Sequence, residues 1–282
     1  MEFTGERFVP QLKGTIELEH VHRYVYSLPY IQNLDVLDIA CGEGYGSALL
    51  AQHARSVTGV DIDQSSIIHA KKDYGNTKNL DFKHGSLTDI PLKDASVDVI
   101  TCFESIEHIT EQNQAMVELK RVLKPSGLLL LSTPNRHVYS DLTGFVNPFH
   151  PKELYRNDLD VLLEKHFKVH FTIGQRVSLS SLILSDQPEN QTTTWLRNPR
   201  HTLANFTQAA TYFFSFASDS DIPKVRNSIY EGYTTLDELL FERGNLISRQ
   251  SALRFLIHNT RILKITLVPL HRFLKKVRSR LK

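Results

Sequence analysis

The fold is decided by one stretch of the sequence, VLDIACGEGYG at residues 36–46. A continuous apolar run enters a Gly-x-Gly-x-Gly turn, and a helical pattern follows. Glycines allow a tight turn and the close approach of a ligand, because they carry no Cβ atom. The free N–H groups at the start of the following helix can then bind a polar or anionic ligand group. The stretch therefore predicts a ligand-binding turn between a buried strand and a helix.

A second apolar run follows at residues 57–61 and ends in Asp61. A carboxylate at the tip of the second strand can accept hydrogen bonds from both hydroxyls of a ribose, as it does in dinucleotide-binding folds. The two runs together predict a site for a cofactor that contains a nucleoside.

Short apolar runs alternate with helical patterns from about residue 15 to residue 175, as in a parallel α/β sheet. We expect strands at 36–40, 57–61, 80–84, 97–103, 128–133, 167–173 and 210–217. Helices are expected at 45–53, 65–74 and 112–123, the last one stopped by Lys124-Pro125-Ser126-Gly127. The pattern predicts a Rossmann-like, mostly parallel sheet of seven strands with helices on both faces.

The composition is that of an ordinary globular protein. Of 282 residues, 41% are hydrophobic and 23% charged, and the mean hydropathy is −0.25. Two cysteines without a CxxC spacing form neither a disulfide framework nor a zinc site, so we expect a cytoplasmic protein. No apolar run resembles a secretory signal or approaches the roughly 18 residues of a spanning helix.

The charge is distributed unevenly along the chain. Residues 243–282 carry 11 Lys and Arg and no acidic residue, so this tail has a formal charge of +11 and the preceding part −9. Leucines at three-, four- and seven-residue steps give the tail one apolar stripe. We expect a basic amphipathic helical tail that docks on an anionic membrane, on the cytoplasmic face of the inner membrane. Packing on the acidic part of the chain or on a second copy is the alternative; no nucleic-acid partner is expected.

These features divide the chain into three parts. Residues 1–34 are expected to cover the cofactor, residues 35–242 to form the main domain with an insertion at about 179–208, and residues 243–282 to form the tail.

Two cofactors compete for the glycine turn. A dinucleotide site requires G-x-G-x-x-G, whereas the glycines here stand at 42, 44 and 46, and position 47 is Ser. Asp38, before the turn, also suits a ligand with an ammonium group better than a pyrophosphate. The stretch resembles motif I of the class I S-adenosylmethionine-dependent methyltransferases, except that Ala40 stands where that family often has its first glycine.

The resemblance continues along the chain, in the family's order and spacing. The stretches KHGSLTDIP (83–91), SVDVI with ESIEHI (96–100 and 104–109) and RVLKPSGL with TPN (121–128 and 133–135) resemble its later motifs. Ser86 replaces the acid usual at the adenine. The resemblance implies S-adenosylmethionine as cofactor and a set of cofactor-binding residues: Asp38, Ala40, Gly42, Gly44, Asp61, Ile62, Ser86, Leu87 and Phe103.

The N-terminal segments FTGERFVP (3–10) and EHVHRY (19–24) look like the leader of methyltransferases from bacterial polysaccharide biosynthesis. The resemblance implies a helix over the cofactor, with Arg23 or Tyr24 reaching its carboxylate. The alternative is that both residues only pack and solvate that helix.

Methyl transfer to a sugar hydroxyl needs a base as well as positioning of the reactants. The candidates for catalysis are His108 and Glu107 after the fourth strand and His150 after the fifth. Glu104, Glu107 and His108 also form E-x-x-E-H, which could place three metal ligands on one helical turn, with His150 as a fourth. Similar motifs bind a divalent metal in some quinone-precursor methyltransferases, but the Glu-His pair also occurs widely in metal-free members, so we do not favour a metal.

We therefore expect an O-methyltransferase that acts on a sugar of a cell-surface glycan or its lipid-linked precursor. One alternative is an O-methyltransferase for a phenol or quinone precursor, and another is an NAD-dependent sugar oxidoreductase. An oligomer is compatible with either reading of the tail.

Overall fold

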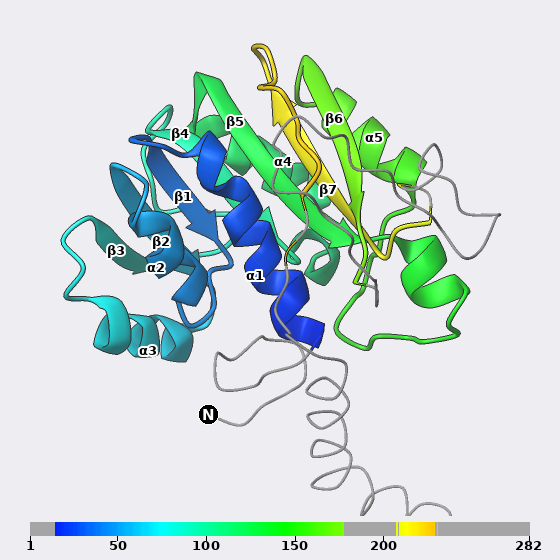
Figure 1. The fold of residues 1–282 in the computed structure, drawn as a ribbon, viewed down its shortest axis with the longest axis horizontal. Helices are drawn as coiled ribbons and strands as arrows, with labels where there is room; N and C mark the ends of the chain where they lie inside the picture. The colour runs from blue at the N-terminus through cyan, green and yellow to red at the C-terminus, as the bar shows by residue number, and fades with distance from the viewer. Residues whose placement is uncertain (1–14, 178–206, 208, 229, 231–282) are drawn as a thin grey trace, which may run out of the picture. The chain divides into compact units, whose positions relative to one another are not determined.

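The computed structural model describes residues 15–177, 207, 209–228 and 230 (Figure 1). Seven strands form one sheet in the order β3-β2-β1-β4-β5-β7-β6. Their bounds are β1 Asp35–Ile39, β2 Ser56–Asp61, β3 Leu80–His84, β4 Val97–Phe103, β5 Leu123–Pro134, β6 Val169–Gln175 and β7 Tyr212–Ser218. β7 runs antiparallel to the other six strands, which are parallel to one another. The predicted Rossmann-like fold is confirmed.

Five α-helices cover the sheet: α1 Thr15–Ser27, α2 Tyr45–Ala51, α3 Gln64–Tyr74, α4 Gln112–Val122 and α5 Arg156–Glu164. Strand side chains alternate between two hydrophobic clusters, because successive residues of a strand point to opposite faces. One cluster joins the sheet to α4 and α5, and the other joins it to α1, α2 and α3. In Figure 1 the latter three helices lie in front of the sheet and the former two behind it.

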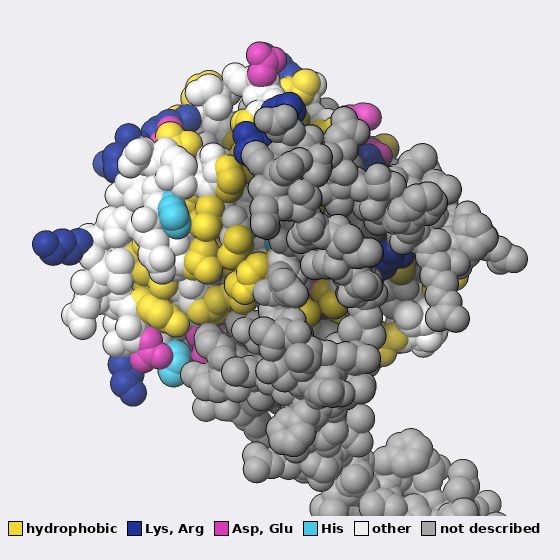
Figure 2. Space-filling view, viewed as in Figure 1, with side chains coloured by type: hydrophobic (Ala, Val, Ile, Leu, Met, Phe, Trp, Pro, Cys, Tyr) yellow, Lys and Arg dark blue, Asp and Glu magenta, His cyan; other side chains and the backbone are white. Residues whose placement is uncertain are grey.

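The front face keeps some apolar surface. Figure 2 shows hydrophobic side chains gathered over α1 and α2, with lysines and arginines toward the edge of the molecule. Tyr45, Ala48 and Leu49 of α2 are partly buried there and pack against the front cluster. No helix among the described residues is long and apolar enough to cross a membrane.

The expected start of the fifth strand at residue 128 is wrong. Helix α4 ends at Val122, one residue before its expected end, and Leu123 already belongs to β5 and pairs with Val97. The next paired residue is Leu128, opposite Val99, so Lys124-Pro125-Ser126-Gly127 forms an irregularity inside the strand and not a separate turn. Proline and glycine are typical of such bulges as well as of helix ends, and this explains the error.

The remaining strand and helix predictions are confirmed within about two residues. The predicted insertion at 179–208 and the tail at 243–282 lie outside the described residues, and the domain boundaries stay predictions. Six strands end, and β7 begins, at the same edge of the sheet. Ligands bind at this carboxyl edge in α/β folds, and the sequence-predicted site residues lie there too.

Candidate functional site

The turn between β1 and α2 has the expected open shape. Gly44 caps α2 with a φ of +82°, and a Cβ atom built on it would lie 2.6 Å from Phe82 Cζ and 2.9 Å from Ala70 Cβ. Gly42 also has a positive φ, +54°, but a Cβ atom there would meet no atom within 4 Å. The turn is thus closed toward the core at Gly44 and open at Gly42, where a cofactor can approach the backbone.

Asp61 lies beside this turn, at the end of β2. Its Oδ2 accepts a hydrogen bond from Gly42 N and its Oδ1 one from Asp63 N, both at 2.8 Å. These bonds fix the carboxylate next to the opening. Ile62, which follows, is 69% exposed, and Leu87, after β3, is 8% exposed.

Ser86 begins the turn that contains Leu87. Its hydroxyl lies 2.9 Å from Thr88 Oγ1 and accepts a hydrogen bond from Thr88 N. The structure therefore brings the predicted ribose and adenine residues to the ends of β2 and β3.

Asp38 lies in β1, just before the glycine turn, and supports the turn through hydrogen bonds. Its carboxylate is buried and accepts hydrogen bonds from Ser47 Oγ at 2.6 Å, Thr101 Oγ1 at 2.7 Å and Tyr24 OH at 3.3 Å. Burial raises the pKa of Asp38 to about 6, against the three hydroxyls, which lower it. The sequence suggested that Asp38 would face an ammonium group of the ligand; in the structure it links α1, α2 and β4.

Helix α1 presents Arg23 and Tyr24 to different places. The Tyr24 ring occupies the space above Gly46, where a Cβ atom would lie 2.0 Å from Tyr24 Cζ, so the third glycine of the turn lets α1 pack on α2. Arg23 Nε donates to Gln175 Oε1 at 2.7 Å, and its guanidinium lies 4.5 Å from the ring centre of Tyr212. Tyr24 thus belongs to the cofactor turn, whereas Arg23 belongs to the ends of β6 and β7.

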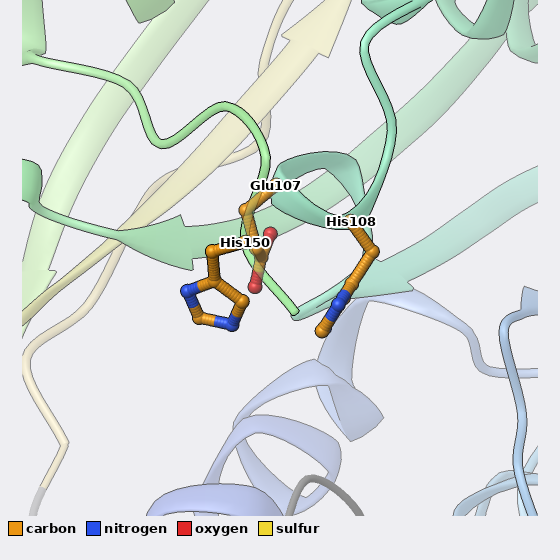
Figure 3. Close-up of side chains that lie close together, drawn as sticks. All are labelled: Glu107, His108 and His150. Carbon is orange, nitrogen blue, oxygen red and sulfur yellow. The ribbon is translucent and has the colours of Figure 1, made fainter. Parts of the chain in front are cut away.

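A second cluster lies at the ends of β4 and β5 (Figure 3). Glu107, His108 and His150 offer ligand atoms that all lie within 4.8 Å of one another. Glu107 and His108 come from the 3-10 turn η2, Ile106–His108, which follows β4. The rings of His108 and His150 meet edge to face with their centroids 4.8 Å apart. The fold therefore brings together the three candidate catalytic residues from two separate loops.

Hydrogen bonds define the tautomers of the two imidazoles. His108 Nδ1 donates to Phe149 O at 2.9 Å, and His150 Nδ1 donates to Glu153 Oε1 at 2.8 Å. Asn147 Nδ2 donates to His150 Nε2 at 3.0 Å. When neutral, both rings therefore carry their lone pair on Nε2. In His150 this lone pair already accepts from Asn147, which has to move before Nε2 can take a proton or bind a metal.

Glu153 is a further member of the site that the sequence did not single out. It is 8% exposed on its side chain and lies opposite the 6% exposed ring of His150, and it also accepts a hydrogen bond from Ser140 Oγ. The spacing of three residues between His150 and Glu153 was visible in the sequence, but a pair at this spacing is common in solvated loops. A carboxylate that holds an imidazole in one orientation is a usual partner of a catalytic or metal-binding histidine.

Glu107 is the most deeply buried member of the cluster. Its Oε2 accepts a hydrogen bond from Thr133 Oγ1 at 3.0 Å, while its Oε1 has no hydrogen-bond partner. Burial raises the pKa of Glu107 well above its usual range, and the neighbouring Glu104 raises it further. A carboxyl group of this kind can donate or accept a hydrogen bond.

Glu104 does not join the cluster. It has a φ of +47° and precedes the 3-10 turn, and Ser132 Oγ donates to its Oε1 at 2.8 Å. The expectation that Glu104, Glu107 and His108 share one helical turn is therefore wrong. One glutamate and two histidines still suit a divalent metal ion, provided that His150 Nε2 exchanges Asn147 for the ion.

Phe103, predicted at the cofactor, is 7% exposed and packs against Tyr24, with ring centroids 5.2 Å apart.

Comparisons with known proteins identify the family. A family model described as "Methyltransferase domain" matches residues 37–131. A "Probable S-adenosylmethionine-dependent methyltransferase" of Mycolicibacterium smegmatis is 41% identical over 178 residues, which are 62% of this chain and 68% of the relative. A "Ubiquinone biosynthesis O-methyltransferase" of Idiomarina loihiensis is 33% identical over 120 residues, 41% of this chain and about half (48%) of that relative.

The fold has solved counterparts as well. The crystal structure of the PH0226 protein from Pyrococcus horikoshii matches 77% of this chain and 99% of its own, with a TM-score of 0.53 and 20% identity. The sequence matches decide between the two cofactors considered above, in favour of S-adenosylmethionine. The chain belongs to the class I S-adenosylmethionine-dependent methyltransferases.

Proposed function

We propose that the protein methylates a hydroxyl oxygen of a sugar, in a cell-surface glycan or its lipid-linked precursor. The observation that carries the proposal is the pair of imidazoles, His108 and His150, which lie beside the buried Glu107 at the carboxyl edge of the sheet and are oriented by hydrogen bonds from Nδ1. A hydroxyl group has to lose its proton when it attacks a methyl group, and an imidazole is the usual acceptor.

The cofactor site would be formed at the ends of β1, β2 and β3. Asp61 would accept the ribose hydroxyls, and the open backbone at Gly42 would lie along the methionine part. Ile62 and Leu87 would contact the adenine, with Ser86 beside them. When bound, S-adenosylmethionine supplies an electrophilic methyl group. The acceptor oxygen would gain this methyl group with release of S-adenosylhomocysteine, and His108 or His150 would take the hydroxyl proton.

Two observations support a glycan as the acceptor. The N-terminal segments resemble those of polysaccharide-biosynthesis methyltransferases, and the basic tail of residues 243–282 suits the anionic membrane surface that holds lipid-linked precursors. We therefore propose a cytoplasmic protein that docks on the cytoplasmic face of the inner membrane. Self-association of the chain is part of the same proposal.

A phenol or quinone precursor is the second candidate acceptor. The likeness to a ubiquinone biosynthesis O-methyltransferase favours it. A divalent ion held by Glu107, His108 and His150 would then lower the pKa of the acceptor hydroxyl in place of a base.

Two measurements test the proposal. Calorimetry on the purified protein should show binding of S-adenosylhomocysteine and none of NADH. Mass spectrometry should show that surface glycan from cells without the protein lacks one methyl group. An unchanged glycan together with a demethylated quinone precursor would select the second candidate.

A further inference from the structure

Arg23 is a buried cation whose hydrogen bonds are incomplete. Its side chain is 1% exposed, and only Nε has a hydrogen-bond acceptor, Gln175 Oε1. Glu104 Oε1 lies 3.5 Å from Nη2, close enough for an ion pair but outside hydrogen-bond geometry. Buried polar atoms nearly always have hydrogen-bond partners, because a buried donor without one has lost its hydrogen bonds to water and formed none in the protein. Two donors of one guanidinium without partners indicate a ligand.

The described residues contain one other such group. Apart from Arg23 Nη1 and Nη2, the only buried side-chain nitrogen or oxygen without a hydrogen bond there is Glu107 Oε1. Both groups lie at the carboxyl edge, Arg23 against the ends of β4 and β6 and Glu107 just after β4. Glu107 Oε1 thus belongs to the histidine cluster, and the two Arg23 atoms lie near the ends of β4 and β6, on the other side of β1 from β2 and Asp61.

The charges around Arg23 favour an uncharged ligand. Glu104 already balances the guanidinium. Glu19 is a second carboxyl group nearby, since it accepts from Tyr212 OH at 3.0 Å and the guanidinium lies over the ring of the same tyrosine. An anion placed here would face both carboxyl groups. Neighbouring hydroxyl groups instead accept from a planar fork of donors and donate to carboxyl oxygens such as Glu107 Oε1.

We infer that Arg23 binds the methyl acceptor, with Nη1 and Nη2 donating to two neighbouring hydroxyl oxygens of an uncharged sugar ring. The inference rests on the proposed function and names the substrate group that it recognises. It replaces the expectation that Arg23 reaches the carboxylate of the cofactor.

The test uses the full chain and the variants Arg23→Gln and Arg23→Lys, with Arg55→Gln as control. Arg55 is an exposed arginine in surface ion pairs with Asp35 and Asp98, so the control makes the same chemical change away from the site. The probes are the methyl α-glycosides of glucose, mannose, galactose and rhamnose, detected by saturation-transfer NMR with S-adenosylhomocysteine saturating. The affinity for S-adenosylhomocysteine itself is measured by calorimetry.

We expect the wild type and Arg55→Gln to bind at least one glycoside, and Arg23→Gln to bind it at least about tenfold more weakly. Arg23→Lys keeps the charge and loses the fork, so it should be weakened too. S-adenosylhomocysteine affinity should stay the same in all four proteins. If Arg23→Gln does not fold, Arg23→Lys is judged by the same criteria.

Three outcomes would overturn the inference. In the first, no glycoside binds the wild type. In the second, the Arg23 variants bind glycosides as the wild type does. In the third, they lose S-adenosylhomocysteine but retain 5′-methylthioadenosine, which lacks the carboxylate, and Arg23 then holds the cofactor. A wild type that does not bind S-adenosylhomocysteine would instead contradict the proposed function.

Discussion

The Asp61 carboxylate is already held by two backbone N–H groups, so it is positioned before any cofactor binds. Replacing Asp61 with Ala removes a charged acceptor for two ribose hydroxyls. We expect S-adenosylhomocysteine affinity to fall by about 2 kcal/mol in calorimetry. Asp81→Ala, on the exposed face of β3, is the control and should bind like the wild type. Equal affinities for both variants would contradict the ribose assignment.

A second prediction concerns the cluster of Glu107, His108 and His150. Replacing the imidazole that serves as base, His108 or His150, with Ala should lower turnover at least about 10²-fold while cofactor affinity stays intact. Glu153→Gln should lower it less, about tenfold, because the amide still contacts His150 but no longer stabilises the imidazolium. Turnover is measured with the acceptor found in the glycan comparison.

A chelator separates the two roles of this cluster. Full activity in EDTA would favour a proton acceptor, whereas activity lost to EDTA and restored by magnesium or manganese would select a metal site. Unchanged turnover in both histidine variants would remove the cluster from the mechanism.

The raised pKa of Asp38 predicts that the stability of the protein depends on pH. Its folded pKa of about 6 lies above the ordinary value of 3.8, because the carboxyl group is buried. Between these values the unfolded chain has lost the proton and the folded chain has kept it, so the free energy of unfolding falls as pH rises through this window. The loss amounts to about 3 kcal/mol at neutral pH.

Asp38→Asn does not titrate and should lack this decline. Urea unfolding of both proteins from pH 4 to pH 7.5 measures the difference, and other titrating groups cancel in the comparison. Parallel pH profiles would show that Asp38 keeps its ordinary pKa in the folded protein.

In the turn between β1 and α2, Gly44 and Gly42 are required for different reasons. Gly44→Ala would push a methyl group into Phe82 and Ala70, and we expect a loss of about 1–3 kcal/mol of stability in urea unfolding. Gly42→Ala meets no atom, so it should cost only about 1 kcal/mol for its positive φ but weaken S-adenosylhomocysteine binding. Similar losses of stability and of affinity in both variants would contradict this division.

How far the sequence predicts the structure differs between elements. The strands and the cofactor turn could be predicted, because apolar runs and glycine spacing are local signals. The orientation of Asp38 could not be predicted, because Thr101 and Tyr24, which bind it, come from distant elements. The same holds for Arg23, whose neighbour Gln175 lies 152 residues away. Contacts made by the fold decide which predicted side chain faces a ligand and which supports the scaffold.

At the scale of the whole molecule, the uneven charge predicts membrane binding. Residues 243–282 lie outside the described residues, so the expectation rests on the sequence alone. We expect the full chain to co-sediment with vesicles in proportion to their anionic-lipid content, and less so at high salt. A chain truncated after Glu242 should stay in the supernatant. Full-length protein in the supernatant at low salt would leave self-association as the role of the tail.

The position of β7 has a consequence for biosynthesis. β7 lies between β5 and β6 in the sheet but is the last of the seven strands to be synthesised. Until it leaves the ribosome, β6 has no neighbour, and the outer edge of β5, with Leu128–Leu131, stays unpaired. Open apolar edges invite pairing with other chains. A chain terminated before residue 212 would therefore be prone to aggregate, whereas a chain that extends past residue 218 closes the sheet.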